Sequence, residues 1–410
     1  MVPENVAYEL YSLDQQYALG LVHDGIIAHV DKLLHRAIER GASDIHVQPH
    51  EHVLVIRERI DGRLYDAEHV DQELAPLIIS RLKILARMDI AKRRLPQDGR
   101  INVIFHPTAH VDRAIDIRVS SFPTLHGEKL VLRILDQGTR LINFEALGLS
   151  EPMQKTMHQL LQRPHGLFLV TGPTGCGKTT MLYAILTMLN SRSKNMVTIE
   201  DPIEYVLPGV SQSQINVTAG FTFDIGLRAL LRQDPDIIML GEIRDKETAN
   251  IAMEAALTGH LVFSTLHTND ALSAVIRLIE MGVEPFLISA TLIGVLAQRL
   301  VRRLCPCCKQ ENTAPASLQP AIHTSHYGPL KNVYKQTGCA SCSQVGFKGQ
   351  IGIFQLLPID QQLAALIGIQ DHAALHALCE KQGVQSLAHD GLSKVEQGIT
   401  TLDEVFSVAQ

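Results

Sequence analysis

The chain has 410 residues, 46% of them apolar, and a formal net charge of −6. This length predicts two or three domains, and the apolar fraction is typical of globular proteins with packed cores. The acidic charge disfavours a nucleic-acid-binding protein, and the absence of tryptophan leaves little material for base stacking. We see neither the basic start and apolar core of a signal peptide nor an apolar run long enough to cross a bilayer. We therefore expect a cytoplasmic protein that reaches a membrane only by docking.

The first part of the chain predicts a lead-in segment followed by a small domain. Residues 1–24 are weakly patterned and fit either a frayed segment or a helix that packs on a neighbour. In residues 25–136, helical spacing of apolar residues predicts helices near the start and at about 76–86, and short alternating runs predict strands. The pair Asp61-Gly62 is typical of a hairpin turn. We expect a small α/β domain with a mostly antiparallel sheet, followed by a linker at 137–150.

Arginines lie at the ends of the expected strands of this domain: Arg100, Arg113, Arg118 and Arg133. They fit either a solvated sheet edge or a set of guanidinium groups that face the phosphates of a nucleotide bound elsewhere. Composition alone favours the solvated edge.

A phosphate-binding loop comes after an expected helix at 151–163. The apolar run at 167–170 predicts a buried strand, which leads into Gly-Pro-Thr-Gly-Cys-Gly-Lys-Thr at 172–179, a full match to the motif. Glycines let backbone N–H groups surround a phosphate, and the following helix adds its positive N-terminal end. The motif assigns Lys178 to the β- and γ-phosphates and the Thr179 hydroxyl to Mg²⁺. ATP and Mg²⁺ are therefore the expected ligands.

Acidic residues follow the next expected strand. The strand at 196–199 ends in Glu200 and Asp201, and Glu204 comes shortly after them. Ligands of open α/β sheets bind at the carboxyl ends of the strands. A helix start would also favour acidic residues, but three carboxylates beside a phosphate-binding loop favour a role in orienting water or in the metal shell.

Two further strands carry polar residues at their ends. The buried strand at 236–240 leads to Glu242, the arrangement in which one carboxylate is delivered to Mg²⁺. His260 and His267 flank the strand at 261–265. These histidines fit either chance surface positions or contacts to the γ-phosphate.

The cysteines indicate a metal site. The stretch at 271–304 is expected to be mostly helical, and helices are expected again at 359–410. Between them, two Cys-x-x-Cys pairs fit a tetrahedral zinc site, and the long spacer would form a protruding loop. Cys307 is a spare thiol that could replace a neighbour. The four expected zinc ligands are Cys305, Cys308, Cys339 and Cys342.

Six stretches occur in a characteristic order: Ala-Ser-Asp-Ile-His-Val (42–47), Leu-Pro-Gln-Asp-Gly-Arg (95–100), Gly-Pro-Thr-Gly-Cys-Gly-Lys-Thr-Thr (172–180), Thr-Ile-Glu-Asp-Pro-Ile-Glu-Tyr (198–205), Leu-Arg-Gln-Asp-Pro-Asp-Ile-Ile-Met-Leu-Gly-Glu-Ile-Arg-Asp (231–245) and Thr-Gly-His-Leu-Val-Phe-Ser-Thr-Leu-His-Thr-Asn (258–269). With these motifs the chain resembles the ATPases that drive type II secretion and type IV pilus assembly, in their zinc-containing assembly form. The resemblance extends from about Ala28 to the C-terminus.

This resemblance implies an α/β fold with a RecA-like P-loop ATPase domain at 151–410. The zinc module at 305–342 is inserted in that domain, and its C-terminal part at 359–410 is helical. Residues 25–136 are implied to form a smaller PAS-like α/β domain that supplies arginines. The resemblance also implies a hexamer in which each nucleotide sits between the two domains.

Roles for single residues follow from the same resemblance. Glu204 would polarise the attacking water, and Glu242 would support Mg²⁺ together with Thr179. Arg118 and Arg133 would act on the transferred phosphate. Nucleotide contacts are implied for Gly172, Pro173, Thr174, Gly175, Cys176, Gly177, Lys178, Thr179, Thr180, Glu200, Asp201, His260, His267, Arg100 and Arg113.

The family's partners imply a cytoplasmic motor at the inner-membrane face, docked on a platform protein, without nucleic acid. Three features depart from the family pattern. Cys176 stands where relatives usually have serine, and Asp224-Ile225-Gly226 lacks an arginine that relatives often carry. We also expect this sequence to lack the N-terminal docking domain that many assembly ATPases carry.

Three alternative functions are each disfavoured by a feature of the sequence. A pilus retraction ATPase is disfavoured by the cysteine pairs, which retraction relatives typically lack. A scaffold that binds nucleotide without hydrolysing it is disfavoured by the full set of acids. A DNA-handling ATPase is disfavoured by the acidic net charge.

Overall fold

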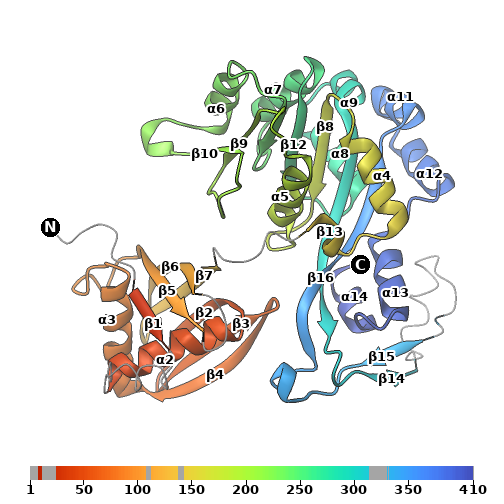
Figure 1. The fold of residues 1–410 in the computed structure, drawn as a ribbon. Coiled ribbons are helices and arrows are strands. Elements are labelled where there is room, and N and C mark those ends of the chain that lie inside the picture. The colour runs from red at the N-terminus through yellow and green to blue at the C-terminus, as the bar shows by residue number, and fades with distance from the viewer. Residues whose placement is uncertain are drawn as a thin grey trace. The chain divides into compact units, whose positions relative to one another are not determined.

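The computed structural model describes residues 8–11, 25–107, 112–136, 143–313, 330 and 332–409. The chain divides into two units, Met1–Arg140 and Leu141–Gln410, and each has its own hydrophobic core (Figure 1). Among the described residues, no helix combines the length and the apolar character that a membrane span needs.

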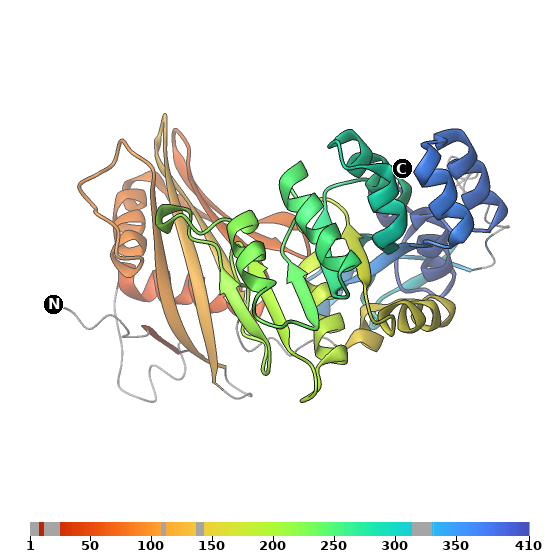
Figure 2. The ribbon, with the colours of Figure 1, turned by 90° about the horizontal axis from the view of Figure 1, so that it is seen from above.

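In its described residues, the first unit is a seven-stranded sheet with two α-helices (Figure 2). Its strands are β1 (Tyr8–Tyr11), β2 (Ala42–Pro49), β3 (Val53–Ile60), β4 (Arg63–Asp71), β5 (Gln97–His106), β6 (Arg113–Thr124) and β7 (Gly127–Asp136), and its helices are α2 (Ile26–Glu39) and α3 (Ala75–Leu85). The strand order is β1-β5-β6-β7-β2-β3-β4, and all neighbours are antiparallel except β1, which is parallel to β5. The expected mostly antiparallel sheet is therefore confirmed.

One face of this sheet is buried by the helices because alternate residues of each strand are apolar. Ile117 of β6 and Leu132 of β7 belong to one core cluster with Leu33 of α2 and Leu82 of α3. The same alternation directs the polar side chains of β5, β6 and β7 to the opposite face.

Strand β1 corrects part of the expectation for the lead-in segment. Of residues 1–24, the structure describes 8–11, and these form an edge strand whose register pairs Tyr8 with Val103. Leu10 is fully buried in the core of the first unit. The helical alternative is wrong for these four residues, because the apolar side chain at position 10 is buried by pairing along β5.

The second unit is a doubly wound sheet with helices on both faces. Its strands are β8 (Gly166–Thr171), β9 (Met196–Glu200), β10 (Ser211–Gln214), β11 (Ile237–Leu240), β12 (Leu261–Leu266), β13 (Leu292–Leu304) and β16 (Phe347–Pro358). The order is β10-β9-β11-β12-β8-β13-β16, parallel throughout except for β16, which is antiparallel to β13. This is the α/β architecture that the sequence predicted.

Helices cover both faces of this sheet, and each face has its own hydrophobic core cluster. Helices α4 (Glu151–Leu161) and α5 (Lys178–Leu189) contribute to one cluster. The other cluster includes α6 (Phe223–Leu230), α7 (Lys246–Leu257), α8 (Ala271–Glu280), α9 (Pro285–Thr291), α11 (Gln361–Ile369) and α12 (His372–Lys381). The last helices, α13 (Leu387–Glu396) and α14 (Leu402–Val408), pack with Val333 of a short hairpin, β14 (Gln310–Asn312) and β15 (Val333–Lys335).

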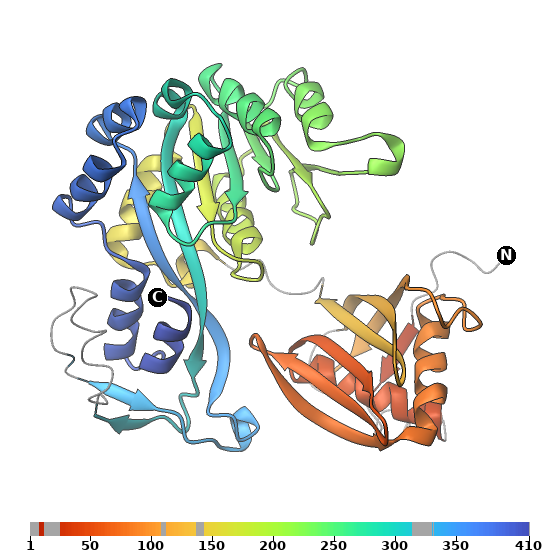
Figure 3. The same ribbon diagram turned by 180° about the vertical axis from the view of Figure 1, so that it is seen from behind.

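The expected helical stretch at 271–304 is wrong in its second half. Residues 271–280 and 285–291 are helical, but residues 292–304 form strand β13, which pairs with both β8 and β16 (Figure 3). Most of β13 is buried, and its uninterrupted apolar part at 292–297 is compatible with either a buried strand or a buried helix. Pairing with β8 decided the outcome. The protruding loop expected between the cysteine pairs falls largely on 314–329, outside the described residues.

Candidate functional site

The phosphate-binding loop connects β8 to α5. All six residues of β8 are buried, so the strand anchors the loop in the centre of the sheet. Gly172, Gly175 and Gly177 have φ values of 150°, 79° and 86°, a region that disfavours side chains. A Cβ atom at Gly172 would lie 2.5 Å from Cys176 Sγ and 2.5 Å from the Gln298 carbonyl oxygen. Only glycine fits this turn.

Lys178 begins α5 and turns back onto the loop. Its Nζ donates hydrogen bonds to the Gly172 carbonyl at 2.8 Å and to the Pro173 carbonyl at 3.0 Å. Burial lowers the pKa of Lys178, and the negative charge of Glu242 acts in the opposite direction. A cation held among loop carbonyls next to a helix N-terminus is suited to receive phosphate oxygens.

Charged residues gather at the carboxyl ends of β9, β11 and β12, the edge of the sheet from which the phosphate-binding loop also leaves β8. Glu242 forms an ion pair with Arg244, and its carboxylate lies 3.3 Å from Nε2 of His267. Arg244 also lies 3.8 Å from the Asp201 carboxylate. The hydrogen bond to Glu242 raises the pKa of the Arg244 guanidinium. Three of the expected site residues, Asp201, Glu242 and His267, are thus brought together.

Glu200 is placed differently from its expected role. Its side chain is buried and accepts hydrogen bonds from the Tyr183 hydroxyl, from Thr198 Oγ1 at 2.6 Å and from Gln212 Nε2 at 3.0 Å. Burial, together with the Glu200 carboxylate, raises the pKa of Tyr183. Glu200 therefore belongs to an internal polar cluster, whereas Glu204 is exposed.

The two histidines that flank β12 lie at opposite ends of that strand. His267 follows the carboxyl end, whereas His260 precedes the first residue and its Nδ1 is 2.9 Å from the Ala255 carbonyl. Six strand residues separate them, which is roughly 20 Å of extended chain. Flanking a strand in sequence therefore did not bring His260 to the edge that carries the phosphate-binding loop.

Sequence reasoning missed two residues of β13 that lie beside the loop. Gln298 Nε2 donates a hydrogen bond to the Cys176 carbonyl at 2.8 Å. Arg299 is buried and donates to the Asn269 carbonyl at 2.7 Å, and burial lowers the pKa of its guanidinium. These contacts could not be predicted because residues 292–304 were expected to be helical. A helix there gave no reason to expect Gln298 and Arg299 beside β8.

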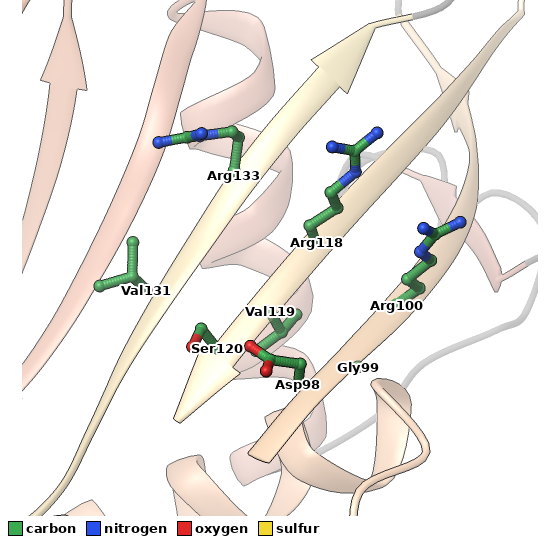
Figure 4. A pocket seen from close by; sticks show the side chains of 8 residues that line it. All are labelled: Asp98, Gly99, Arg100, Arg118, Val119, Ser120, Val131 and Arg133. Atoms are coloured by element: carbon green, nitrogen blue, oxygen red, sulfur yellow. The ribbon is translucent and has the colours of Figure 1, made fainter. Parts of the chain in front are cut away.

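Three arginines of the first unit form a ladder across its sheet (Figure 4). Arg100 on β5 is in register with Arg118 on β6, which is in register with Arg133 on β7. They line a pocket of about 530 Å³ with Asp98 and Ser120. Nε of Arg118 is buried, and among the described residues it has no hydrogen-bond partner. The ladder thus presents an unsatisfied donor, as expected of a surface that receives an anion.

Arg133 and Arg113 are each held by a carboxylate. Arg133 Nε donates a hydrogen bond to Oδ1 of the buried Asp44 at 3.1 Å, across the β7–β2 register. Arg113 alternates to the other face of β6, where it pairs with Asp136 at 2.5 Å and stacks 5.0 Å from the Phe105 ring. Arg113 is therefore separated from the ladder by the pleat of its strand.

The four expected zinc ligands are close together. Their Sγ atoms all lie within 4.8 Å of one another, with Cys305–Cys339 and Cys308–Cys342 at 3.8 Å and Cys339–Cys342 at 3.7 Å. Zn–S bonds of about 2.3 Å place the sulfurs of a tetrahedral site about 3.8 Å apart. The cluster therefore fits zinc, while Cys307 is exposed and outside the group.

Comparisons with known proteins agree with this geometry. Residues 22–407 match the family model described as "Type II/IV secretion system protein". The chain is 46% identical to the type II secretion system protein E of Pseudomonas aeruginosa and 47% identical to the type II secretion system ATPase E of Vibrio cholerae, over 94% of its own length and 76% and 75% of theirs. The structure is similar to the crystal structure of the pilus retraction motor PilT with bound ADP, with a TM-score of 0.60, 26% identity, and coverage of 92% of this chain and 96% of that one. The chain therefore belongs to the type II/IV secretion system protein family.

Proposed function

We propose that this protein is an ATP hydrolase that powers type II protein secretion or type IV pilus assembly. The observation that carries the proposal is the edge of the second sheet, where the phosphate-binding loop after β8 shares the carboxyl ends of neighbouring strands with Glu242, Asp201 and His267. The names of the curated relatives support the secretion role over the pilus role.

In the proposed reaction, backbone N–H groups of residues 172–178 and the Lys178 ammonium bind the β- and γ-phosphates. The Thr179 hydroxyl and the Glu242 carboxylate are oxygen donors of the kind that hold Mg²⁺, which supplies charge neutralisation at these phosphates. Glu204 orients and polarises the attacking water. The arginine ladder neutralises charge that develops on the transferred phosphoryl group.

The finer features of the proposal concern assembly. We place the chain as a homohexamer at the cytoplasmic face of the inner membrane, where it acts on a platform protein. The four-cysteine cluster would hold a structural zinc that orders the hairpin β14–β15, because closed Cys₄ sites contribute to folding and leave no open coordination position.

Replacing Glu204 by glutamine tests the catalytic assignment. Glu204→Gln removes the basic carboxylate but keeps the size of the side chain. We expect the affinity for a fluorescent ATP analogue to be unchanged and the rate of phosphate release to fall by about 100-fold or more, within the range for general-base removal. The control is Glu254→Gln, at an exposed position of α7 in the same unit. Turnover at the wild-type rate in Glu204→Gln would refute the proposed role.

A further inference from the structure

The loop that carries Glu204 is held by side chains of the next strand, β10. Residues 201–210 join β9 to β10, and β10 lies at the edge of the sheet, where β9 is its only neighbour among the described strands. Ladder hydrogen bonds therefore fix the two strands but not the loop between them. The conformation of the loop depends on other contacts.

Gln212 provides two of these contacts. Its Oε1 accepts a hydrogen bond from the Leu207 N–H at 2.6 Å, and its Nε2 donates to the Tyr205 carbonyl at 3.2 Å. The same amide group also donates to Glu200 Oε1 at 3.0 Å and lies 3.3 Å from the Tyr183 hydroxyl. One side chain thus ties two backbone groups of the loop to the buried polar cluster.

Two neighbours complete the attachment on the other side of Glu204. Gln214 Oε1 accepts from the Ile203 N–H at 3.2 Å, and the Tyr183 hydroxyl accepts from the Glu204 N–H at 3.4 Å. The rings of Tyr183 and Tyr205 pack edge to face at 4.5 Å. Because Tyr183 belongs to α5, the helix that starts at Lys178, the same contacts relate the loop to the phosphate-binding motif.

We propose that Gln212 is a positioning residue for Glu204, acting through the buried cluster it forms with Glu200 and Tyr183. This inference rests on the proposed function, in which Glu204 orients the attacking water. It also gives a task to Glu200, whose carboxylate is buried in this cluster. Gln212 itself touches neither the nucleotide nor the water in this scheme.

The positions of these hydrogen bonds indicate that Gln212 affects the rate of ATP hydrolysis and not only the stability of the fold. The groups bound by Gln212 and Gln214 lie on both sides of Glu204 within five residues, at 203, 205 and 207. Loss of these contacts frees the backbone at Glu204 while the phosphate-binding loop keeps its own support from β8 and β13. Displacing a reacting group by about 1 Å reduces rates by up to about 100-fold. The expected signature is a loss of kcat without a loss of nucleotide binding.

The test uses Gln212→Met in the full chain, because methionine keeps the length of the side chain and removes both hydrogen-bonding groups. We expect kcat for ATP hydrolysis to fall by about 10-fold or more, with KM and the affinity for a fluorescent ATP analogue changed less than about twofold. Ser213→Ala on the same strand is the matched control and should keep the wild-type kcat. Tyr183→Phe, which removes the acceptor for the Glu204 N–H, should show the same selective loss of kcat.

A double-mutant cycle separates positioning from a general effect. If Gln212 acts through Glu204, then Gln212→Met should lower kcat much less in the Glu204→Gln background than in the wild type. Multiplicative losses in the double variant would overturn the inference, as would wild-type kcat in both Gln212→Met and Tyr183→Phe. Failure of the proposed function is distinguished from this by Glu204→Gln alone, since active Glu204→Gln contradicts the water-orienting role whatever Gln212 does.

Discussion

At the scale of single residues, the pleat of β6 directs two of its arginine side chains to opposite faces of the sheet. Arg118 and Arg133 stand opposite each other on one face of the first sheet, and Arg100 continues the row. Arg113 lies on the same strand as Arg118 but five residues away, an odd number, so it points to the other face. There it is satisfied by Asp136 and the Phe105 ring. The proposed role in phosphate charge neutralisation therefore applies to three of the four arginines.

This separation predicts different outcomes for the same substitution at two positions of β6. Arg118→Ala should lower kcat for ATP hydrolysis by about 100-fold or more, because an arginine on a transferring phosphoryl group contributes strongly to the rate. Arg113→Ala should keep kcat within about twofold and lower the free energy of unfolding by about 1 kcal/mol, the scale of a partly exposed ion pair and a cation–π contact. Phosphate release and denaturant titration measure the two effects. Equal losses of kcat would contradict the sorting by face.

At the scale of elements, β1 is a four-residue edge strand attached in part through a histidine. His106 of β5 lies 2.5 Å from Glu9 and 2.9 Å from Asp112. Partial burial lowers the pKa of His106, but the hydrogen bonds to these carboxylates outweigh burial and raise it above the ordinary value. Because the folded-state pKa is raised, the stabilisation is fully present below about pH 6.5 and is lost as the pH rises through the folded-state pKa.

Docking of β1 should therefore weaken between mildly acidic and alkaline pH. Hydrogen exchange of amides 8–11, corrected for the intrinsic pH dependence, should show more protection at pH 6 than at pH 8.5. His106→Gln should remove this difference, and the amides of the interior strand β6 should show none in either protein. A pH-dependent difference that persists in His106→Gln would assign it to another group.

The zinc module is a second element with a direct test. Purified protein should contain one zinc per chain by atomic absorption, and Cys342→Ser should lose it, because a closed site needs all four thiolates. Loss of the metal should also disorder the hairpin β14–β15, which metal binding would otherwise fold. Cys307→Ser is the matched control, since Cys307 is exposed and outside the cluster. Loss of zinc in Cys307→Ser would show that the spare thiol is a ligand.

At the scale of the whole molecule, the two units have separate cores, and the phosphate-binding loop belongs to the second. Calorimetry should therefore show two unfolding transitions, because separate cores need not unfold together. A non-hydrolysable ATP analogue at 100 times its Kd should stabilise the second unit by about 2.7 kcal/mol and raise its transition. Lys178→Ala should abolish that shift, with Lys194→Ala, an exposed lysine, as the control. Equal shifts of both transitions would indicate one cooperative unit.

The sequence by itself determined those features whose chemistry is contiguous along the chain. The phosphate-binding loop was recognisable because glycines, Lys178 and Thr179 must stand next to one another to surround a phosphate. The four cysteines were recognisable because two tight pairs suffice to define the ligands of a tetrahedral metal site. Hydrophobic periodicity predicted the parallel strands at 167–170, 196–199, 236–240 and 261–265, and with them the α/β class, but it did not predict β13.

Only the tertiary structure decided what depends on neighbours and faces. The pairing of β13 with β8 made residues 292–304 a strand and brought Gln298 against the phosphate-binding loop. His260 and His267 are separated because they lie at opposite ends of β12. The buried side chain of Glu200 forms hydrogen bonds with Tyr183 and Gln212. These outcomes arise from contacts between residues far apart in sequence, and local patterns carry no record of them because the same residue types satisfy the same periodicity in either placement.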